Sequence, residues 1–466
     1  MTKLVIIGGS DAGISAALRA KEVDAQTEVS VIVADSFPNY SICGLPFYLS
    51  GEVPDWHSLA HRTADDIRAA GIHLLLNQTA QDIDANTHQV TVTTTHGQSQ
   101  NIAYDRLLLA TGATSIRPSI RGLDLPRVYT LHWMDDSFAV QKYLNTNAPR
   151  SAVIIGGGYI GVEMADALTV RGIAVTLIEH GPSVLKTVES SLGDILSAEL
   201  QQHGVNVVNG VAIEELTQEG TQIRVKGSHG FSTETEMVLV AVGVRPVADL
   251  AASAKVETGI QGAIRVTRSM ETNVADIYAA GDCVETWHRL LHHSTYLPLG
   301  TTTHKQGRVA GENMLGGQRE FAGTLGTQVV KVFEKVAART GLKDAEAASA
   351  GFDPLTVEST FWDHKVYYPG AHELRLRVTG DRKTGQLLGA QMVGHVQGEI
   401  AKRIDIFATA LFHEMSIDAL SDLDLSYTPP LSSPWDPVQM SAQAWQHHAQ
   451  LLPSQTPVVE RPASVV

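Results

Sequence analysis

Apolar and polar positions in the first half of the chain follow one pattern twice. Residues 4–35 give a short β-branched run, a glycine-rich turn, an alanine-rich helical stretch and a second apolar run that ends in an acid. Residues 152–180 repeat this order, 148 residues later when counted from Gly8 to Gly156. Solenoid repeats recur every ~20–50 residues, so this longer spacing predicts two duplicated strand–helix–strand units.

Further apolar runs extend the pattern of both units. Residues 104–114 (YDRLLLATGAT) and 237–247 (MVLVAVGVRPV) each predict a buried strand that leaves through a glycine turn. Residues 272–283 (TNVADIYAAGDC) predict a strand with an acid at its end. Residues 297–317 predict a helix that stops at its final pair of glycines.

The pattern changes near residue 325. Residues 327–333, 373–380 and 387–395 predict strands, and residues 400–415 predict a helix, which together indicate a separate α+β domain. From residue 451 onward no periodicity remains, and we expect a disordered tail.

Composition narrows the classes of protein that fit. The 466 residues suffice for two to four domains, and 35 basic against 50 acidic residues give a net charge of −15, which disfavours nucleic acid and anionic membranes as partners. The first apolar run breaks at Gly8 and no stretch reaches about 18 apolar residues, so we expect neither a signal peptide nor a membrane span. The two cysteines, Cys43 and Cys283, cannot form a disulfide framework, which favours a cytoplasmic protein.

The second unit contains a G-x-G-x-x-G motif between a strand and a helix, formed by Gly156, Gly158 and Gly161. The first glycine permits a tight turn, the second lets a pyrophosphate approach the backbone, and the third lets helix and strand pack closely. Glu179 ends the next strand, where a carboxylate accepts hydrogen bonds from ribose hydroxyls and repels a 2′-phosphate. We therefore expect a dinucleotide site that prefers NADH to NADPH.

The first unit is less regular. Gly8, Gly9 and Gly13 are present, but Ser10 stands where the middle glycine is expected. Asp35, 22 residues after Gly13, is the candidate for binding a ribose, and a turn cap is the alternative. The unit predicts a second nucleotide site.

Three segments resemble motifs of the FAD-dependent pyridine nucleotide–disulfide oxidoreductases. Residues 272–282 resemble the second flavin-binding motif, and residues 110–112 and 243–246 resemble the linker motifs. The resemblance runs in consistent order over about residues 3–440, and it implies that Asp282 binds the ribityl hydroxyls of FAD. The residues that it assigns to the cofactors in these segments are Ala110, Thr111, Gly112, Gly243, Gly281 and Asp282.

Cys43 lies in the segment 39–51 (NYSICGLPFYLSG). Classical members of the family carry two cysteines here, five apart, whereas this chain has Tyr48 at the second position. It therefore resembles the single-cysteine branch, which includes coenzyme A disulfide reductases, NADH oxidases and peroxidases, and polysulfide or persulfide reductases. The resemblance implies that the Cys43 thiolate attacks a disulfide sulfur or is oxidised to a sulfenic acid. We expect Cys283 to be packed and inert.

Further site residues also come from the resemblance. Residues 363–370 and 425–430 resemble dimerisation segments, which implies a homodimer in which Tyr368 and Tyr427 reach the active site of the partner chain. His304 is a candidate to face the site, with a locally satisfied helix-start histidine as the alternative. Glu163 resembles an acid near the nicotinamide, with a salt-bridged helix residue as its alternative.

Some positions depart from the family pattern. Asp11 stands where the peroxidases carry a histidine, which disfavours a peroxidase. Glu22 and Trp435 stand where coenzyme A disulfide reductases carry basic residues, so coenzyme A itself is disfavoured as a substrate. No metal is expected, although histidines four apart share one face of a helix. The histidines concerned are His288, His292 and His293.

The resemblance implies an α/β protein with two Rossmann-like nucleotide-binding domains and a C-terminal α+β dimerisation domain. The expected function is transfer of electrons from NADH through FAD and Cys43 to a low-molecular-weight disulfide, polysulfide or persulfide. An NADH oxidase that reduces dioxygen through a sulfenic acid, and a flavin redox sensor, remain alternatives. The expected boundaries are 1–115 and 249–324 for FAD binding, 116–248 for NAD binding, 325–450 for dimerisation and 451–466 for the tail.

Overall fold

A computed structural model describes residues 2–451, which form two compact units. Both nucleotide-binding repeats of the sequence analysis lie in the first compact unit, and from here on "first unit" and "second unit" mean the compact units. The first unit comprises residues up to Gly326 together with Val330–Glu334, and the second comprises Thr327–Val329 and the chain from Lys335 onward. The expected tail falls outside the described residues, apart from residue 451.

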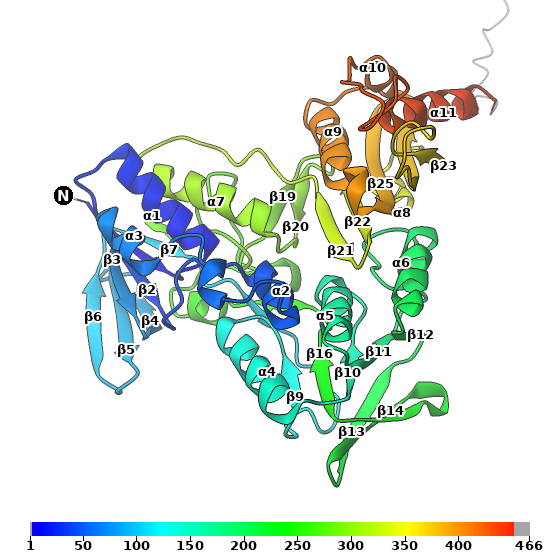
Figure 1. Cartoon of the computed structure of the whole chain (residues 1–466). Coiled ribbons are helices and arrows are strands. Elements are labelled where there is room, and N and C mark those ends of the chain that lie inside the picture. Colours follow the sequence, from blue (N-terminus) through cyan, green and yellow to red (C-terminus); the bar gives the residue numbers. More distant parts are fainter. Residues whose placement is uncertain (1, 452–466) are drawn as a thin grey trace, which may run out of the picture. The chain divides into compact units, whose positions relative to one another are not determined.

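The first unit contains two five-stranded parallel sheets, which confirms the duplicated α/β pattern (Figure 1). Their strands are mostly apolar because both faces of each sheet are covered: helices pack on one face, and a three-stranded antiparallel sheet packs on the other. The first sheet has the order β18 (Ile277–Ala279), β7 (Arg106–Leu109), β1 (Lys3–Ile7), β2 (Glu28–Val33) and β3 (His73–Leu76). The second has the order β12 (Asn206–Asn209), β11 (Ala174–Glu179), β10 (Ser151–Ile155), β16 (Met237–Val240) and β9 (Val128–Thr130).

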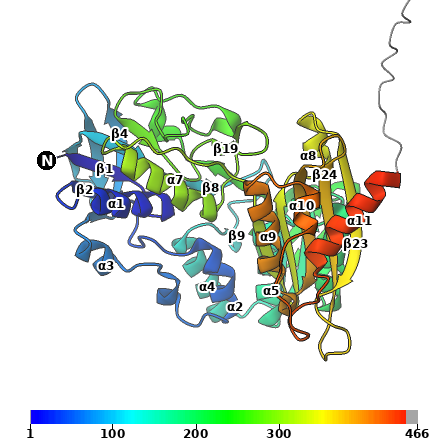
Figure 2. The ribbon, with the colours of Figure 1, turned by 90° about the horizontal axis from the view of Figure 1, so that it is seen from above.

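Helix α1 (Asp11–Val23) follows β1, and α5 (Tyr159–Val170) follows β10 at the corresponding place. Helix α7 (Gly300–Asn313) lies beside α1 in both views of the molecule (Figure 1 and Figure 2). Two glycines of α7 permit this approach, because a Cβ atom on Gly307 or on Gly311 would lie 2.2 Å from a carbonyl oxygen of α1. Helix α7 ends at Asn313, shortly before the expected stop at Gly316 and Gly317.

Shorter elements complete the first unit. It also contains two three-stranded antiparallel sheets and two strand pairs. His288 and His293 lie on opposite strands of one pair and His292 lies in the turn between them, so the helical spacing considered for these histidines is wrong. The sheets are β4 (Gln78–Asp84), β5 (Gln89–Thr94), β6 (Ser99–Ala103) and β13 (Ile213–Glu219), β14 (Gln222–Gly227), β15 (Ser232–Thr235); the pairs are β8 (Ala113–Ser115) with β17 (Val244–Pro246) and β19 (Thr286–His288) with β20 (His293–Thr295); the helices are α2 (Leu45–Ser50), α3 (Ala64–Ala69), α4 (Met134–Asn147) and α6 (Ser190–Gln202).

The second unit is built on an antiparallel sheet, as expected for an α+β domain. The order is β21 (Gln328–Val332), β22 (Lys335–Gly341), β25 (Leu387–His395), β24 (Glu373–Asp381) and β23 (Pro354–Trp362). The helices are α8 (Asp344–Ser349), α9 (Ile400–Phe412), α10 (Ile417–Ser421) and α11 (Pro437–Leu451). The three predicted strands and the predicted helix α9 are confirmed, whereas β22, β23 and α11 were not predicted.

In the described part of the chain, no helix combines the length and the apolar character that crossing a membrane requires.

The close contact between α1 and α7 allows us to predict how a substitution at Gly311 changes the stability of the protein. Replacing Gly311 by Ala normally favours a helix, but here the added Cβ would lie 2.2 Å from the carbonyl oxygen of Ala16. We expect Gly311→Ala to destabilise the protein by about 1–3 kcal/mol through overpacking, seen as a lowered thermal midpoint of the holoenzyme. Lys305→Ala, at an exposed position of the same helix, is the control and should leave the midpoint nearly unchanged. An unchanged midpoint for Gly311→Ala would contradict this account of the contact.

Candidate active site

The first glycine-rich loop is folded tightly between β1 and α1. Gly8 has a left-handed backbone with φ of 120°, and a Cβ atom there would lie 2.0 Å from the carbonyl oxygen of Ala110. A Cβ atom on Gly13 would lie 1.9 Å from the carbonyl oxygen of Gly8, and one on Gly9 would collide with Val33. Ser10 makes no side-chain cap, so backbone N–H groups of the first turn remain available to an anion.

The second loop repeats this geometry between β10 and α5. Gly156 has φ of 107°, and a Cβ atom on Gly161 would again lie 1.9 Å from the carbonyl oxygen of the first glycine. The Cβ position of Gly158, at the start of α5, faces open space with no atom within 4 Å. This loop leaves room where a pyrophosphate would approach the backbone.

Glu179 ends β11 with its carboxylate held by the second loop. Its two oxygens accept hydrogen bonds from the N–H groups of Gly157 and Gly181, each at 2.7 Å. The negative charge is therefore fixed at the edge of the loop, where the sequence analysis placed the ribose.

Asp35 lies just beyond the C-terminal end of β2 and is half-buried. It accepts a hydrogen bond of 2.8 Å from the N–H of Phe37, which is the turn-capping arrangement named as its alternative role. Burial raises the pKa of Asp35.

The linker motifs lie together beside the first loop. Ala110 directly follows β7, and Thr111 donates a hydrogen bond to the carbonyl oxygen of Val247. Gly112 has φ of 70° and precedes β8, whereas Gly243 has φ of 114° and precedes β17, which pairs with β8. The two linker motifs thus lead into strands that pair side by side in antiparallel orientation.

Asp282 lies close to the end of β18, as predicted. Its Oδ1 atom accepts a hydrogen bond of 2.9 Å from the Thr303 hydroxyl, and the N–H of Gly281 donates to Gln306 of α7 at 3.0 Å. Burial raises the pKa of the Asp282 carboxyl, and the charge of Asp11 raises it further, while the Thr303 hydrogen bond opposes both.

Cys43 lies in the turn Ile42–Gly44, immediately before α2, and is exposed. Asn39 ties this segment to the first loop, because its N–H donates to Gly9 and its side chain donates to Asp11 at 3.1 Å. At the other end of α2, Arg171 donates to the carbonyl oxygen of Leu49 at 2.8 Å. The thiol segment is therefore held by both nucleotide-binding units, and Figure 1 shows α2 beside α5.

The charges around Cys43 oppose its ionisation. Partial desolvation raises the pKa of the thiol, and the carboxylates of Glu163, Asp11 and Asp282 raise it further, in that order. These acids come from three distant parts of the sequence: Asp11 from the first nucleotide-binding repeat, Glu163 from the second, and Asp282 from the segment after β18. Their charges all act on one thiol. Cys283, in contrast, is fully buried.

Glu163 lies on α5 with an unusual proton affinity. Burial and the neighbouring charge of Asp166 raise its pKa to about 7, while the positive charge of Lys331 lowers it. Asp166 and Lys331 were not anticipated, because a buried helix acid and a lysine in an apolar strand carry no motif. Asn39 was part of the quoted segment, but its contacts were not predicted.

Three further predicted residues are exposed in the structure. His304 is exposed on α7. Tyr368 and Tyr427 lie exposed in the second unit, where their two segments meet through a hydrogen bond from the Lys365 N–H to the carbonyl oxygen of Pro429. A hydrogen bond between Tyr427 and Tyr367 raises the pKa of Tyr427.

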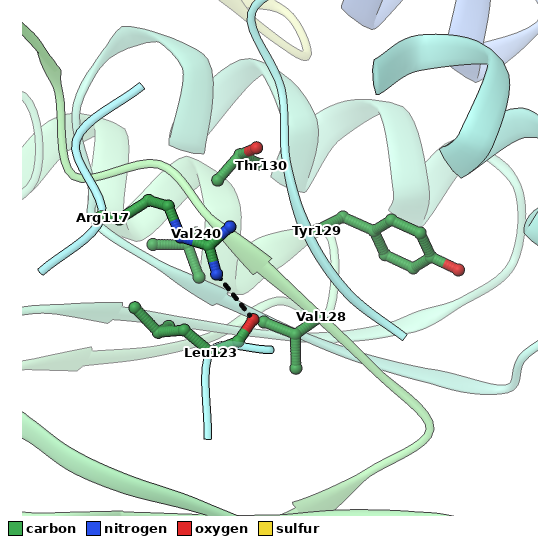
Figure 3. A pocket seen from close by; sticks show the side chains of 6 residues that line it. All are labelled: Arg117, Leu123, Val128, Tyr129, Thr130 and Val240. Carbon is green, nitrogen blue, oxygen red and sulfur yellow. Dashed lines mark hydrogen bonds between the residues drawn. The ribbon is translucent and has the colours of Figure 1, made fainter. Parts of the chain in front are cut away.

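Figure 3 shows the residues around a separate depression, which no predicted site residue lines. Its only long cation, Arg117, already donates to the carbonyl oxygen of Leu123 at 3.3 Å and to Asp124 at 2.5 Å. Within residues 2–451, no group of three or more His, Cys, Asp or Glu side chains is placed to hold a metal ion. The pocket is lined by Arg117, Leu123, Val128, Tyr129, Thr130 and Val240.

The two loops fit dinucleotides. Each presents an uncapped helix start, and the open Gly158 position leaves space for a pyrophosphate. At the first loop, the buried amide oxygen of Asn39 lacks a hydrogen-bond partner among the described residues, as expected of a group that faces a polar ligand. The fold and the site are those of an oxidoreductase that binds two dinucleotides and presents one exposed thiol.

Comparison with known proteins identifies the family. Residues 2–307 match the pyridine nucleotide-disulphide oxidoreductase family, and residues 327–437 match its dimerisation domain. The chain belongs to this family, which implies FAD, NAD(P)H and a homodimer.

Relatives of the chain carry related names. An NAD(P)H sulfur oxidoreductase (CoA-dependent) of Pyrococcus abyssi is 34% identical over 94% of this chain and 97% of its own. An NADH oxidase of Methanocaldococcus jannaschii is 30% identical over 95% and 98%. The structure of an NAD-dependent persulfide reductase from A. fulgidus is similar with a TM-score of 0.92 and 34% identity, over 96% of this chain and 84% of that one.

The surroundings of Cys43 predict its reactivity. Iodoacetamide should modify one thiol of the native protein, at Cys43, because Cys283 is buried. Since the thiolate reacts and the pKa of Cys43 is raised, the rate should keep rising above about pH 8.5, the ordinary pKa of a cysteine. Mass spectrometry of timed samples measures both site and rate. Faster alkylation than free cysteine at pH 7 would contradict the expected charge effect.

Proposed function

We propose that the protein uses NADH to reduce a low-molecular-weight disulfide, polysulfide or persulfide through Cys43. The observation that carries this proposal is the exposed thiol in a segment that Asn39 ties to the first glycine-rich loop and Arg171 ties to the C-terminal end of α5. The first glycine-rich loop and Asp282 would hold FAD, which would supply the chemistry that links hydride transfer from NADH to the two-electron reduction of sulfur. The names of the sulfur and persulfide reductases among its relatives support the same acceptor class.

The chain's own residues perform the sulfur chemistry. The Cys43 thiolate attacks one sulfur of the acceptor, forms a mixed disulfide and releases the other half as a thiolate. Asn39 and Arg171 hold the segment that presents this thiol. Asp282 and Asp35 are proposed to hold ribityl and ribose hydroxyls, and Glu179 to hold the adenosine ribose of NADH.

A second function rests on the same thiol. An exposed cysteine also reacts with oxygen-derived peroxide to give a sulfenic acid, and one relative is named an NADH oxidase. Two measurements on the same sample separate the two functions: the rate of NADH consumption with disulfides in the absence of oxygen, and the rate of oxygen uptake without a sulfur acceptor. Rapid uptake without any sulfur acceptor would overturn the reductase proposal, and the absence of steady NADH consumption in either assay would favour a redox sensor.

Replacement of the thiol tests its role. Cys43→Ser should retain FAD and its reduction by NADH, yet lose at least about 100-fold in disulfide turnover because the hydroxyl does not form the mixed disulfide. Flavin absorbance measures cofactor reduction, and NADH consumption measures turnover. Cys283→Ala is the matched control and should keep turnover. Unchanged turnover in Cys43→Ser would make the thiol a bystander.

Glu179 is proposed to set the preference for NADH. Glu179→Arg replaces a fixed negative charge by a positive one, so the ratio of kcat/KM for NADPH to that for NADH should rise by about tenfold or more. Because this change also removes two backbone hydrogen bonds, Glu179→Gln serves as the control: it removes the negative charge and one of the two acceptor oxygens without adding a positive charge, and it should show a smaller rise. A constant ratio in both variants would remove Glu179 from the ribose pocket.

The second unit is proposed to supply Tyr368 and Tyr427 to the site of the partner chain in a homodimer. Their neighbourhood is an exposed apolar patch, which is typical of an interface. Its exposed members are Val366, Tyr367, Tyr368, Tyr427, Leu431 and Trp435.

Mixed dimers test this arrangement. Subunits with Cys43→Ser and subunits with both Tyr368→Phe and Tyr427→Phe should each form poorly active homodimers. Heterodimers, purified with two tags, should regain about half of the wild-type activity, because one of their two sites then combines an intact thiol with intact tyrosines. Failure of the heterodimer to regain activity, or full activity of the double tyrosine variant, would refute action across the interface.

A further inference from the structure

One buried polar contact in the first unit joins helix α7 to the acid that follows β18. Thr303, in the first turn of α7, is 9% exposed, and its hydroxyl group donates a hydrogen bond of 2.9 Å to Oδ1 of Asp282. Within residues 2–451, no hydrogen-bond donor reaches Oδ2 of the same carboxylate. The contact therefore holds one carboxylate oxygen and leaves the other for a ligand.

The main chain around this acid is fixed separately. Gln306, one turn further along α7 and buried, accepts a hydrogen bond of 3.0 Å from the N–H of Gly281. The hydroxyl group of Tyr296 donates to the carbonyl oxygen of Asp282 at 3.0 Å. With the backbone held in this way, the direction of the Asp282 side chain is the part that depends on Thr303.

Helix α7 is itself held in place, because it packs closely against α1 (Figure 1). A Cβ atom on Gly307 would lie 2.2 Å from the carbonyl oxygen of Ala12, and Gly307 lies four residues after Thr303, on the same face of the helix. A Cβ atom on Gly281 would lie 3.2 Å from Cγ2 of Thr303. The methyl group of Thr303 thus lies beside Gly281, and its hydroxyl group lies beside Asp282.

A second acceptor competes for the same hydroxyl hydrogen. A threonine in a helix often donates to the carbonyl oxygen one turn earlier, and the carbonyl oxygen of Leu299 lies 3.0 Å from the hydroxyl oxygen of Thr303. A hydroxyl group has one hydrogen, so it cannot serve both acceptors fully. Hydrogen bonds to ionised groups are shorter and stronger than those to neutral groups. The hydrogen is therefore expected on the side of Asp282 whenever this acid is ionised.

We propose that Thr303 is a positioning residue of the FAD site, whose hydroxyl group fixes the Asp282 carboxylate so that Oδ2 is free to accept from the ribityl hydroxyl groups. This inference rests on the proposed function, in which Asp282 holds that part of FAD. Thr303 acts through Asp282: it selects one direction of the side chain, and its hydrogen bond lowers the pKa of the carboxyl against the effect of burial. A carboxylate that is fixed before FAD binds loses less freedom on binding.

The test measures how firmly the full-length holoenzyme holds FAD. Holoenzyme is diluted, and the release of FAD is followed by the rise of flavin fluorescence, which needs no electron acceptor. Thr303→Val keeps the branched shape of the side chain but removes the hydroxyl group, so FAD should leave about tenfold faster. Thr303→Ser restores the hydroxyl group and should bring the rate back to within about twofold of the wild-type rate. A wild-type rate in Thr303→Val, or a failure of Thr303→Ser to restore it, would overturn the inference.

Thr302 provides the matched control in the same turn of the helix. It is buried, and its hydroxyl group donates to that of Thr324 at 3.4 Å, so Thr302→Val loses a comparable hydroxyl group that does not contact the acid. This variant should release FAD at nearly the wild-type rate. Equal acceleration in Thr302→Val and Thr303→Val would indicate a general loosening of α7 and would overturn the inference.

A double variant tests whether Thr303 acts through the charge of Asp282. Asp282→Asn removes this charge and should itself speed the release of FAD. Adding Thr303→Val to Asp282→Asn should then have a smaller effect than in the wild type, about threefold or less, because the hydrogen bond no longer ends on an ionised group. The same factor in both backgrounds would contradict the proposed link between the two residues.

The pH dependence gives a readout that packing alone would not move. Loss of the Thr303 hydrogen bond should raise the pKa of Asp282, so on acidification the release of FAD should accelerate at a higher pH in Thr303→Val than in the wild type. The charge of Asp11 also acts on Asp282, but it is common to both proteins. Burial raises the pKa values of the neighbouring thiols and of the neighbouring phenol, which therefore stay neutral between about pH 5 and pH 8. These groups are Cys43, Cys283 and Tyr296. Identical pH profiles would show that the hydroxyl group does not act on the ionisation of Asp282 and would overturn the inference.

The result for Asp282→Asn separates this inference from the proposed function. If FAD leaves this variant no faster than it leaves the wild type, the assignment of Asp282 to the cofactor is refuted together with the inference. If Asp282→Asn releases FAD faster while Thr303→Val does not, only the inference fails and the assignment stands. Cys43 takes no part in these measurements, so the outcome of Cys43→Ser does not bear on them.

Discussion

The close approach of backbone to backbone at the two glycine-rich loops is the constraint on which the structure depends. In each loop, a Cβ atom on the last glycine would lie 1.9 Å from the carbonyl oxygen of the first. No side chain fits at such a distance, so the helix that follows each loop can begin only where these glycines allow. Both helices then start next to the C-terminal end of a buried strand, and both bring an acid, Asp11 or Glu163, toward the same thiol.

This convergence creates an electrostatic conflict at Cys43. A reactive thiol functions as a thiolate, yet three carboxylates and partial desolvation favour its neutral form. A carboxyl group that is itself only partly ionised near pH 7 reduces this conflict, because it can be neutral while the sulfur is charged.

The parts of the molecule that sequence could predict are those with a strong local pattern. The parallel strands, the glycine turns and the helix starts follow from apolar periodicity and from residues such as Gly8 and Gly156, whose backbone conformation few other residues adopt. The spacing of His288 and His292 fits one face of a helix, yet the two residues lie in a short hairpin, because spacing alone does not separate a hairpin from a helical turn. The ion pair between Lys331 and Asp166 could not be predicted. It forms because residues 330–334 group with the first unit, and nothing in the local sequence signals that contact.

The face shared by α1 and α7 bears on the choice of acceptor. Arg19 and Arg308 both pair with Glu22, at 2.9 Å and 3.1 Å, and Arg19 also binds Glu312 at 2.7 Å. A ligand with a phosphate would have to displace these carboxylates before it could use either guanidinium, and it would meet their charge first. Several relatives are named as CoA-dependent or as coenzyme A disulfide reductases, and the ion pairs of this face show that in this chain both guanidinium groups are already bound by carboxylates.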